Sequence, residues 1–496
     1  MDSLKKRHPF PIGGGDDRDP PIETGKQDME IETILAQFAS DTKYEDLPKE
    51  PIEVIRNVVL TVLGTTIAGA TAEGCEILVN QTKEWGGKKE ATILIHGGRV
   101  PAHNAALVNS VMARALDFCD AMSPGIHMGS SSVPTALATA ELVGGCNGKD
   151  FLTALVVGSE VAARLNLPGS TYDGFDPTGV CTIFAAAAIA GKLLRLNSKQ
   201  MLNALALAFN RSGGSFQSNI DGSLAVRLIQ GFVSQAGIIC AQLAQKGLDG
   251  PKNFLQGIYG YFHLYAKDRY NPEFVVSELG KRFEMTKVLF KKYPSCGGTL
   301  SSTDAILKIM QEKEVTSENV EQIDIKVLPY IYKLVGHPFK AGENPKVNAQ
   351  FNIQYCVANA LLRKSSKLEH FDELCIRDPR IMELTEKIYV HPEPALEKRG
   401  HNTALKMTVT TKDGNVHHKR VDIASGFPGN PLNKEEHKER FEGCISYSGD
   451  LLPRENTEKV EALVNSLEEV EEVSISMIPL LVRPVRKDGA FTPPFL

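Results

Sequence analysis

The sequence has no cluster of residues that would bind a structural metal. Its nine cysteines occur singly, with no C-x-x-C pair and no group of cysteines and histidines at metal-binding spacing. Zinc and iron–sulfur centres need several such ligands close together, so neither is expected. The odd cysteine count, without a disulfide-framework spacing or a signal-peptide pattern, predicts reduced thiols and a cytoplasmic protein.

Long apolar runs and an excess of positive charge are also missing. The most apolar stretch, residues 183–194, is short and is interrupted by Lys192, whereas a membrane-spanning helix needs roughly 18 or more apolar residues. The net charge of -5 provides no general attraction to nucleic acids or to anionic membranes. We therefore expect a soluble protein that has neither of them as a partner.

The composition that remains is that of a globular protein. The chain has 496 residues, of which 42% are hydrophobic and 23% are charged. This length exceeds what one ordinary hydrophobic core supports, so two domains are expected. Residues 1–28 combine prolines, a Gly-Gly-Gly run and dense charge with little to bury, which predicts a disordered lead-in.

Helical patterns dominate residues 29–287. Apolar residues recur at helical spacing from residue 29 onward and again over residues 51–68. Further helices are predicted over residues 101–115, 134–143, 150–165, 182–194, 198–210 and 226–246. Frequent small residues would let these helices approach closely, so we expect one large helical domain.

The pattern changes in residues 288–429. Residues 320–327 alternate between apolar and polar, which predicts a strand, and two alternating runs over residues 404–421 flank the turn sequence Lys412-Asp-Gly-Asn415. Helices are predicted at 300–311 and 352–362, which together with the strands indicate a small α+β domain. Residues 430–496 return to helical patterns, at 434–441 and 456–467.

A polar turn between two predicted helices is the strongest candidate site. It follows the helix over residues 101–115, and it contains Asp117, Asp120 and His127 within eleven residues. An imidazole titrates near neutral pH and suits proton transfer. By residue pattern alone, however, Asp117 and Asp120 would serve equally well as structural caps, and His127 as a hydrogen-bonded loop residue.

Six separated segments of the chain resemble motifs of one known family. They are Ala115-Leu-Asp-Phe-Cys-Asp120, Val157-Gly-Ser-Glu-Val-Ala-Ala-Arg164, Phe175-Asp-Pro-Thr178, Lys291-Lys-Tyr-Pro-Ser-Cys296, Ala349-Gln-Phe-Asn-Ile-Gln-Tyr355 and Gly426-Phe-Pro-Gly-Asn-Pro431. Each segment is short, but six in the same order resemble the MmgE/PrpD family. That family contains 2-methylcitrate dehydratase, cis-aconitate decarboxylase and iminodisuccinate epimerase.

The resemblance implies a mainly α fold: a large all-helical domain formed by both chain ends, with a smaller α+β lid domain inserted between them. It also implies a homodimer that acts on a small carboxylate substrate without a metal or organic cofactor. The activity expected first is that of a hydro-lyase similar to 2-methylcitrate dehydratase. The alternatives are an epimerase or isomerase of an amino- or hydroxy-dicarboxylate, a decarboxylase, and a carboxylate-binding relative without catalysis.

The matched motifs also imply roles for individual residues. Asp117 and His127 match a carboxylate and a histidine that face the family's site, where the histidine is implicated in proton transfer or carboxylate binding. Lys291 matches a lysine that binds a substrate carboxylate, and Tyr293 lies in the same motif. Arg227 resembles an arginine of a family segment and is expected to bind substrate, although a half-buried ion pair is an equally good interpretation.

Three positions depart from the family pattern. Val226 stands where relatives have a lysine, Asp176 where they have a histidine, and Ala121 where they have a threonine. Two groups that carry positive charge or protons are lost and one negative group is gained, so a tricarboxylate would be poorly neutralised. We therefore expect a substrate with fewer carboxylates than methylcitrate, or one with an amine that Asp176 binds.

Overall fold

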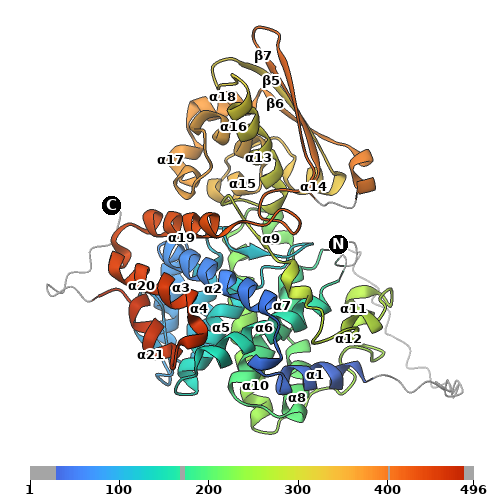
Figure 1. The fold of residues 1–496 in the computed structure, drawn as a ribbon, viewed down its shortest axis with the longest axis vertical. Coiled ribbons are helices and arrows are strands. Elements are labelled where there is room, and N and C mark those ends of the chain that lie inside the picture. Colours follow the sequence, from blue (N-terminus) through green and yellow to red (C-terminus); the bar gives the residue numbers. More distant parts are fainter. Residues whose placement is uncertain (1–29, 168–171, 173, 400–402, 485–496) are drawn as a thin grey trace, which may run out of the picture. The chain divides into compact units, whose positions relative to one another are not determined.

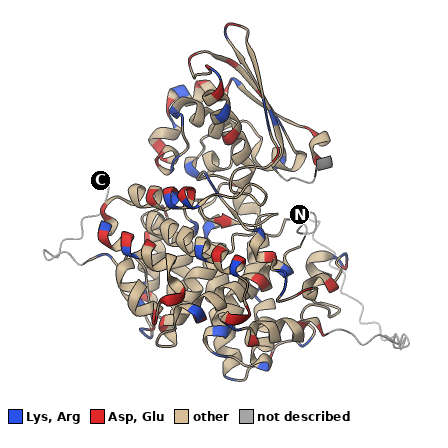
Figure 2. Cartoon of the chain, viewed as in Figure 1, with Lys and Arg blue, Asp and Glu red and all other residues tan. Residues whose placement is uncertain are grey.

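The structure is a computed structural model (Figure 1). It describes residues 30–167, 172, 174–399 and 403–484, and for residues 398 and 399 it describes the backbone alone. The lead-in predicted over residues 1–28 lies outside the described residues. The described chain is mainly α-helical, which confirms the predicted fold class. Acidic and basic residues are interspersed along its helices and strands (Figure 2).

The first section of the chain is a set of packed helices. They are α1 (Ile31–Asp41), α2 (Lys49–Gly69), α3 (Cys75–Trp85), α4 (Ala102–Arg114), α5 (Gly129–Leu142), α6 (Gly148–Leu165), α7 (Pro177–Leu193), α8 (Ser198–Phe209), α9 (Gln217–Ile220), α10 (Leu228–Gln245), α11 (Tyr261–Ala266) and α12 (Glu273–Val276). Two short strand pairs accompany them: β1 (Ala91–Thr92) with β2 (Arg99–Val100), and β3 (Asp120–Ala121) with β4 (Leu289–Phe290).

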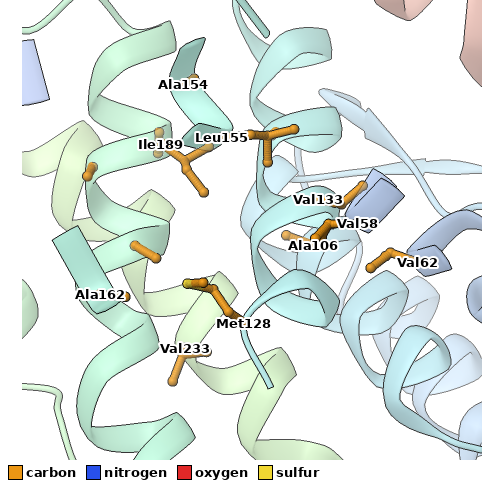
Figure 3. Packing of buried hydrophobic residues seen from close by; sticks show 14 of the residues in the cluster. Val58, Val62, Ala106, Met128, Val133, Ala154, Leu155, Ala162, Ile189 and Val233 are labelled. Carbon is orange, nitrogen blue, oxygen red and sulfur yellow. The ribbon is translucent and has the colours of Figure 1, made fainter. Parts of the chain in front are cut away.

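Helix α7 lies at the centre of this section and packs against α6, α10, α5 and α8 (Figure 1). Every residue of α7 except Lys192 is buried, as expected for a helix that is apolar on all sides. Small residues permit the close packing: a Cβ added at Gly237 of α10 would lie 2.4 Å from the Cβ of Ala186 in α7. Val58, Val133 and Ile189 are among the aliphatic side chains that fill the surrounding core (Figure 3).

Helix α5 begins at Gly129, earlier than the predicted start at residue 134. The segment Gly-Ser-Ser-Ser has low helix propensity, so its pattern did not indicate a helix. Tertiary contacts override this propensity, because a carboxylate oxygen of Asp120 lies 2.9 Å from the backbone nitrogen of Gly129 and accepts its hydrogen bond. A carboxylate at this position satisfies a backbone donor at the helix N-terminus.

The section from residue 297 to 421 contains helices and one four-stranded sheet. The strands β5 (Val320–Val327), β6 (Ile388–Pro392), β7 (Leu405–Thr411) and β8 (Val416–Val421) lie in the order β6-β5-β7-β8, and only the β5–β6 pair is parallel. The predicted strand at 320–327 and the predicted hairpin are confirmed. The helices are α13 (Gly297–Glu312), α14 (Pro329–Val335), α15 (Pro345–Gln350), α16 (Ile353–Arg363), α17 (Glu373–Ile376) and α18 (Pro379–Thr385).

This section has a hydrophobic core of its own. Helices α13 and α16 pack against each other, α13 contacts β7 and β8, and α16 contacts β6. Alternate residues of β5, such as Ile323 and Ile325, point into this core, so the period-2 pattern of the sequence reflects one buried face. Sequence patterns missed β6, whose short run has a single fully buried residue, Ile388.

The C-terminal helices return to the first section. They are α19 (Lys434–Ser448), α20 (Arg454–Asn465) and α21 (Val473–Met477). Helices α19 and α20 pack on α2, and α21 packs on α5. Residues 31–496 form a single contact unit, so the domain boundaries expected at residues 287 and 429 stay a prediction.

Two helical segments, Lys49–Gly69 and Leu224–Gln245, are long and apolar enough to cross a membrane by length and composition alone. The expectation that no apolar stretch of the chain is long enough to cross a membrane was therefore too strict. Most of each segment is buried against other helices, which is also the pattern of a core helix in a folded domain.

Candidate active site

A cavity of about 470 Å³ contains most of the predicted site residues. Asp117, His127, Lys291 and Asp176 all line it. Its walls come from the end of α4, the turn that follows α4, the start of α10, the loop after β4, the start of α13, and α14. The volume is within the range of about 300 to 1,000 Å³ that is usual for small-molecule sites.

Short strand pairing brings the two parts of the site together. Residues Asp120 and Ala121 of β3 pair with Phe290 and Leu289 of β4, and Lys291 follows β4 directly. The Nζ atom of Lys291 consequently lies 2.7 Å from Oδ1 of Asp117, although the two residues are 174 positions apart. The polar turn and the Lys291 motif, which are distant in sequence, therefore form one site.

Asp117 is held between two cations. Its backbone adopts a left-handed conformation with φ 50°, which aspartate tolerates better than most residues. Its Oδ1 atom accepts hydrogen bonds from the guanidinium of Arg114 and the ammonium of Lys291. Burial by itself would raise the pKa of Asp117, but Arg114 and Lys291 outweigh that effect and hold the pKa at about 2.

This charge cluster is buried and is not fully satisfied. Arg114, Asp117 and Lys291 are only 3%, 2% and 1% exposed. The cluster carries one positive charge in excess, and both Oδ2 of Asp117 and Nε of Arg114 lack a hydrogen-bond partner within the described structure. Burying charges in this way is costly for stability, which is typical of residues kept for function.

His127 is an uncharged imidazole at neutral pH. Burial, then the nearby charges of Arg114 and Lys291, hold the pKa of His127 well below its usual value of 6.5. Its Nδ1 atom lies 3.0 Å from the backbone oxygen of Asp120. We therefore assign the imidazole proton to Nδ1, which donates a hydrogen bond to that oxygen. The lone pair of the Nε2 atom then accepts a long hydrogen bond of 3.4 Å from the Arg114 guanidinium, and a proton of the substrate can replace this contact.

The three positions that depart from the family pattern all line the cavity: Ala121, Asp176 and Val226. Asp176 is also the N-cap of α7, because its Oδ1 atom accepts a hydrogen bond of 2.8 Å from the backbone nitrogen of Thr178. Burial raises the pKa of Asp176. The three departures from the family pattern are therefore placed where they can change which substrate the cavity binds.

Tyr293 and Arg227 are not brought to the cavity. The hydroxyl of Tyr293 donates a hydrogen bond of 3.0 Å to Asp304, and a guanidinium nitrogen of Arg227 donates one of 2.9 Å to the backbone oxygen of Glu73. Neither side chain is among those that line the cavity in the described part of the chain. The predicted catalytic role of Tyr293 and the predicted substrate-binding role of Arg227 therefore lack the direct contact that each requires.

Two further residues line the cavity without having been predicted from sequence. Arg114 precedes the first motif by one residue, and the only available signal was that α4 has no other arginine, lysine, aspartate or glutamate. Gln230 lies one turn beyond Val226 in α10 and is 1% exposed, yet its side-chain oxygen has no partner among the described residues. A buried polar atom without a partner is a candidate ligand-binding group.

No group of three or more histidine, cysteine, aspartate or glutamate side chains is placed to hold a metal ion among the residues that the structure describes. Cys119 and Cys296 lie near the charge cluster, but burial raises the pKa of each thiol to about 11. Both are therefore protonated at neutral pH and are poor nucleophiles.

Comparison with known proteins identifies relatives over most of the chain. Residues 33–273 match the MmgE/PrpD N-terminal domain and residues 293–469 match the MmgE/PrpD C-terminal domain. Cis-aconitate decarboxylase of Homo sapiens is 26% identical over 465 residues, which cover 90% of this chain and 94% of the relative. The 2-methylcitrate dehydratase of Cupriavidus necator is 23% identical over 407 residues, which cover 76% of this chain and 81% of the relative.

Proposed function

The chain belongs to the MmgE/PrpD family, and we propose from this premise that it is a cofactor-independent lyase that breaks a bond next to a carboxylate of a small organic acid. Relatives named as a decarboxylase and as a dehydratase are both lyases, which supports a lyase-type enzyme. The observation that carries the proposal is the neutral His127 beside Arg114 and Lys291 in one cavity.

The cations are arranged to bind a carboxylate. Asp117 occupies part of the hydrogen-bonding capacity of Lys291, whose ammonium has three donors, and it orients both Lys291 and Arg114. The N-terminus of α13 also faces the cavity through Gly297 and Gly298, which lack side chains that would cover their backbone N–H groups. Fixed cations and backbone donors stabilise the negative charge that grows on a carboxylate as the neighbouring carbon loses a proton.

His127 is the proposed acid and base. Its Nε2 lone pair removes the proton from the carbon next to the bound carboxylate, and the imidazolium then gives this proton to the departing hydroxyl, which leaves as water. The negative charge of a bound carboxylate also favours the protonated imidazole, so binding brings the pKa of His127 closer to neutrality. Proton transfer of this kind typically contributes a factor of about 10² to 10⁴ to the rate.

Hydro-lyase activity is the first candidate because a neutral imidazole can accept a proton at once. Decarboxylation is the second candidate, because relatives named cis-aconitate decarboxylase match over a larger share of the chain. In that reaction His127 would have to be protonated before it could deliver a proton to the carbanion. Release of water, release of carbon dioxide, and entry of solvent deuterium into unreacted substrate distinguish a dehydratase, a decarboxylase and an epimerase.

Turnover of a panel of hydroxy-, amino- and unsaturated dicarboxylates by matched variants tests the proposal. His127→Asn should lower kcat by about 10²-fold or more, whereas His103→Asn, a histidine of α4 outside the cavity lining, should not. Lys291→Met should raise KM, whereas Lys292→Met, which loses only a partly exposed pair with Glu436, should not. Full activity in both cavity variants would rule out this site.

The homodimer and the cytoplasmic location expected from sequence stay proposals. A candidate dimer surface is the outer face of α10, where Phe232, Ile239 and Leu243 follow helical spacing and are each at least a third exposed. An exposed row of large apolar side chains is a candidate for contact with a partner. A second copy of the chain is the partner that we propose.

A further inference from the structure

One wall of the cavity is apolar, and most of it comes from a single short helix. Leu328, Ile331 and Leu334 recur every three residues at the start of α14 and along it, and all three line the cavity. Residues three apart lie on one face of a helix. Phe351 and Phe427 extend this apolar wall from the neighbouring α15–α16 connection and from the loop after β8.

The positive charge available to a ligand is limited by comparison. Arg114 and Lys291 are the cations among the described lining residues, and Asp117 already neutralises one of their two charges. Val226 presents an apolar side chain at this cavity, and Asp176 and Glu397 add further carboxylates to the lining. The remaining positive charge and the backbone N–H groups at the N-terminus of α13 can bind two carboxylates between them. A third ligand carboxylate would be placed among apolar groups and like charges, which is strongly unfavourable.

We infer that the substrate is a small dicarboxylic acid whose remaining substituent is an apolar chain, with the carboxylates at the Arg114–Lys291 cluster and the chain against the α14 face. This inference rests on the proposed function, because it assumes that the carboxylate end is the reacting end. Gln230 also lines the cavity, and its partnerless side-chain oxygen can accept a hydrogen bond from a ligand hydroxyl without demanding a further negative charge.

Binding of unreactive ligands to the full chain tests this substrate class. Calorimetric titration would compare succinate, 2-butylsuccinate and propane-1,2,3-tricarboxylate at one ionic strength. Burial of each methylene strengthens binding by roughly fourfold, so 2-butylsuccinate should bind at least tenfold more tightly than succinate. The tricarboxylate should bind no more tightly than succinate. Tighter binding of the tricarboxylate than of 2-butylsuccinate would overturn the inference.

Variants of the apolar wall provide the second arm. Ile331→Ala should weaken the binding of 2-butylsuccinate by several fold and leave the binding of succinate unchanged. If Ile331→Ala does not fold, Leu334→Ala, at a half-buried position, serves the same purpose. Leu374→Ala, on the exposed face of α17, is the matched control and should change neither ligand. Val226→Lys should strengthen the binding of the tricarboxylate by about tenfold or more. Equal weakening of all three ligands by the wall variants contradicts the inference.

The two proposals fail in different ways. If none of the three ligands binds, the carboxylate site is wrong and both proposals fall. If 2-butylsuccinate binds as expected but His127→Asn keeps full turnover, the proposed chemistry fails and the substrate class stands.

Discussion

The guanidinium Nε atom of Arg440 lies 2.6 Å from the backbone oxygen of Lys291 and donates a hydrogen bond to it. The same side chain donates to the backbone oxygen of Phe118 at 2.8 Å and to the hydroxyl of Thr61 at 2.9 Å. A buried arginine of the C-terminal helix α19 therefore ties together the two segments that carry Asp117 and Lys291. We interpret Arg440 as a positioning residue.

Arg440→Lys tests this positioning role. A lysine keeps the charge but cannot reach all three acceptors, and each buried acceptor left without a donor costs about 1 to 3 kcal/mol. We expect the free energy of unfolding in urea to fall by about 2 to 4 kcal/mol. We also expect kcat to fall at substrate saturation, because Lys291 is displaced from Asp117. Lys438→Ala, on the exposed side of α19, is the control. An unchanged kcat in folded Arg440→Lys would mean that Arg440 is only structural.

The carboxyl of Asp120 should make stability depend on pH. Burial raises the pKa of Asp120 from 3.8 to about 6. Between these two values the folded state holds a proton that the unfolded state has released, so this contribution to stability is present below about pH 4 and is lost as the pH rises to about 6. The lowered pKa values of Asp117 and His127 have the opposite sign, since their contributions are lost as the pH falls.

Asp120→Asn isolates this effect. The amide oxygen can still accept the hydrogen bond from Gly129, but no buried charge forms at high pH. We expect the variant to gain stability relative to the parent, by an amount on the order of 2 kcal/mol, as the pH rises from 4 to 7. Chemical denaturation across this range measures the difference. A difference that does not change with pH would show that Asp120 titrates normally.

Asp176 combines a structural role with a position in the cavity. Asparagine caps helices about as well as aspartate, so Asp176→Asn should change stability by less than about 1 kcal/mol. Loss of the negative charge should strengthen the binding of a dicarboxylate by several fold and weaken the binding of an amine-bearing substrate. Asp176→Ala, which also removes the cap of α7, separates the two roles in thermal unfolding. Identical kinetics of Asp176→Asn and the parent on every substrate would remove Asp176 from the binding site.

The oligomeric state tests the outer face of α10. Phe232→Asp places a charge in the proposed contact, and we expect it to convert a dimer into a monomer in light scattering. Leu374→Asp, on the exposed side of α17, should leave the dimer intact. A parent protein that is itself monomeric at micromolar concentration would contradict the proposal.

Several features could be predicted from sequence because they depend on local patterns. The helix at residues 198–209 has its apolar spacing and its asparagine cap next to each other in the chain, and the β7–β8 hairpin has alternation on both sides of an Asp-Gly turn. By contrast, the start of α5 depends on the Asp120 carboxylate, which the strand pair β3–β4 helps to place. No local pattern records that contact.

In the candidate site, too, some residues could be predicted from local sequence patterns and others depend on tertiary contacts. The motif residues Asp117, His127 and Lys291 were predicted by resemblance and lie in one cavity. Their neighbours Gln230 and Arg440 could not be predicted, because a glutamine in an apolar helix and an arginine in a charged one have no distinctive pattern. Tyr293 shares the Lys291 motif, but the chain bends over residues 292–295, after β4 has ended, and the hydroxyl of Tyr293 contacts Asp304 instead.

The sequence by itself determined the family, most of the long helices, the strand β5, the β7–β8 hairpin and the polar turn from Asp117 to His127, because each depends on residues that are close together in the chain. Only the tertiary structure decided that Lys291 reaches Asp117, that His127 is uncharged, and that α14 gives the cavity an apolar wall. These properties depend on burial and on distances between residues far apart in the chain. Electrostatic energies change steeply with both, so they follow from the fold and not from the order of residues.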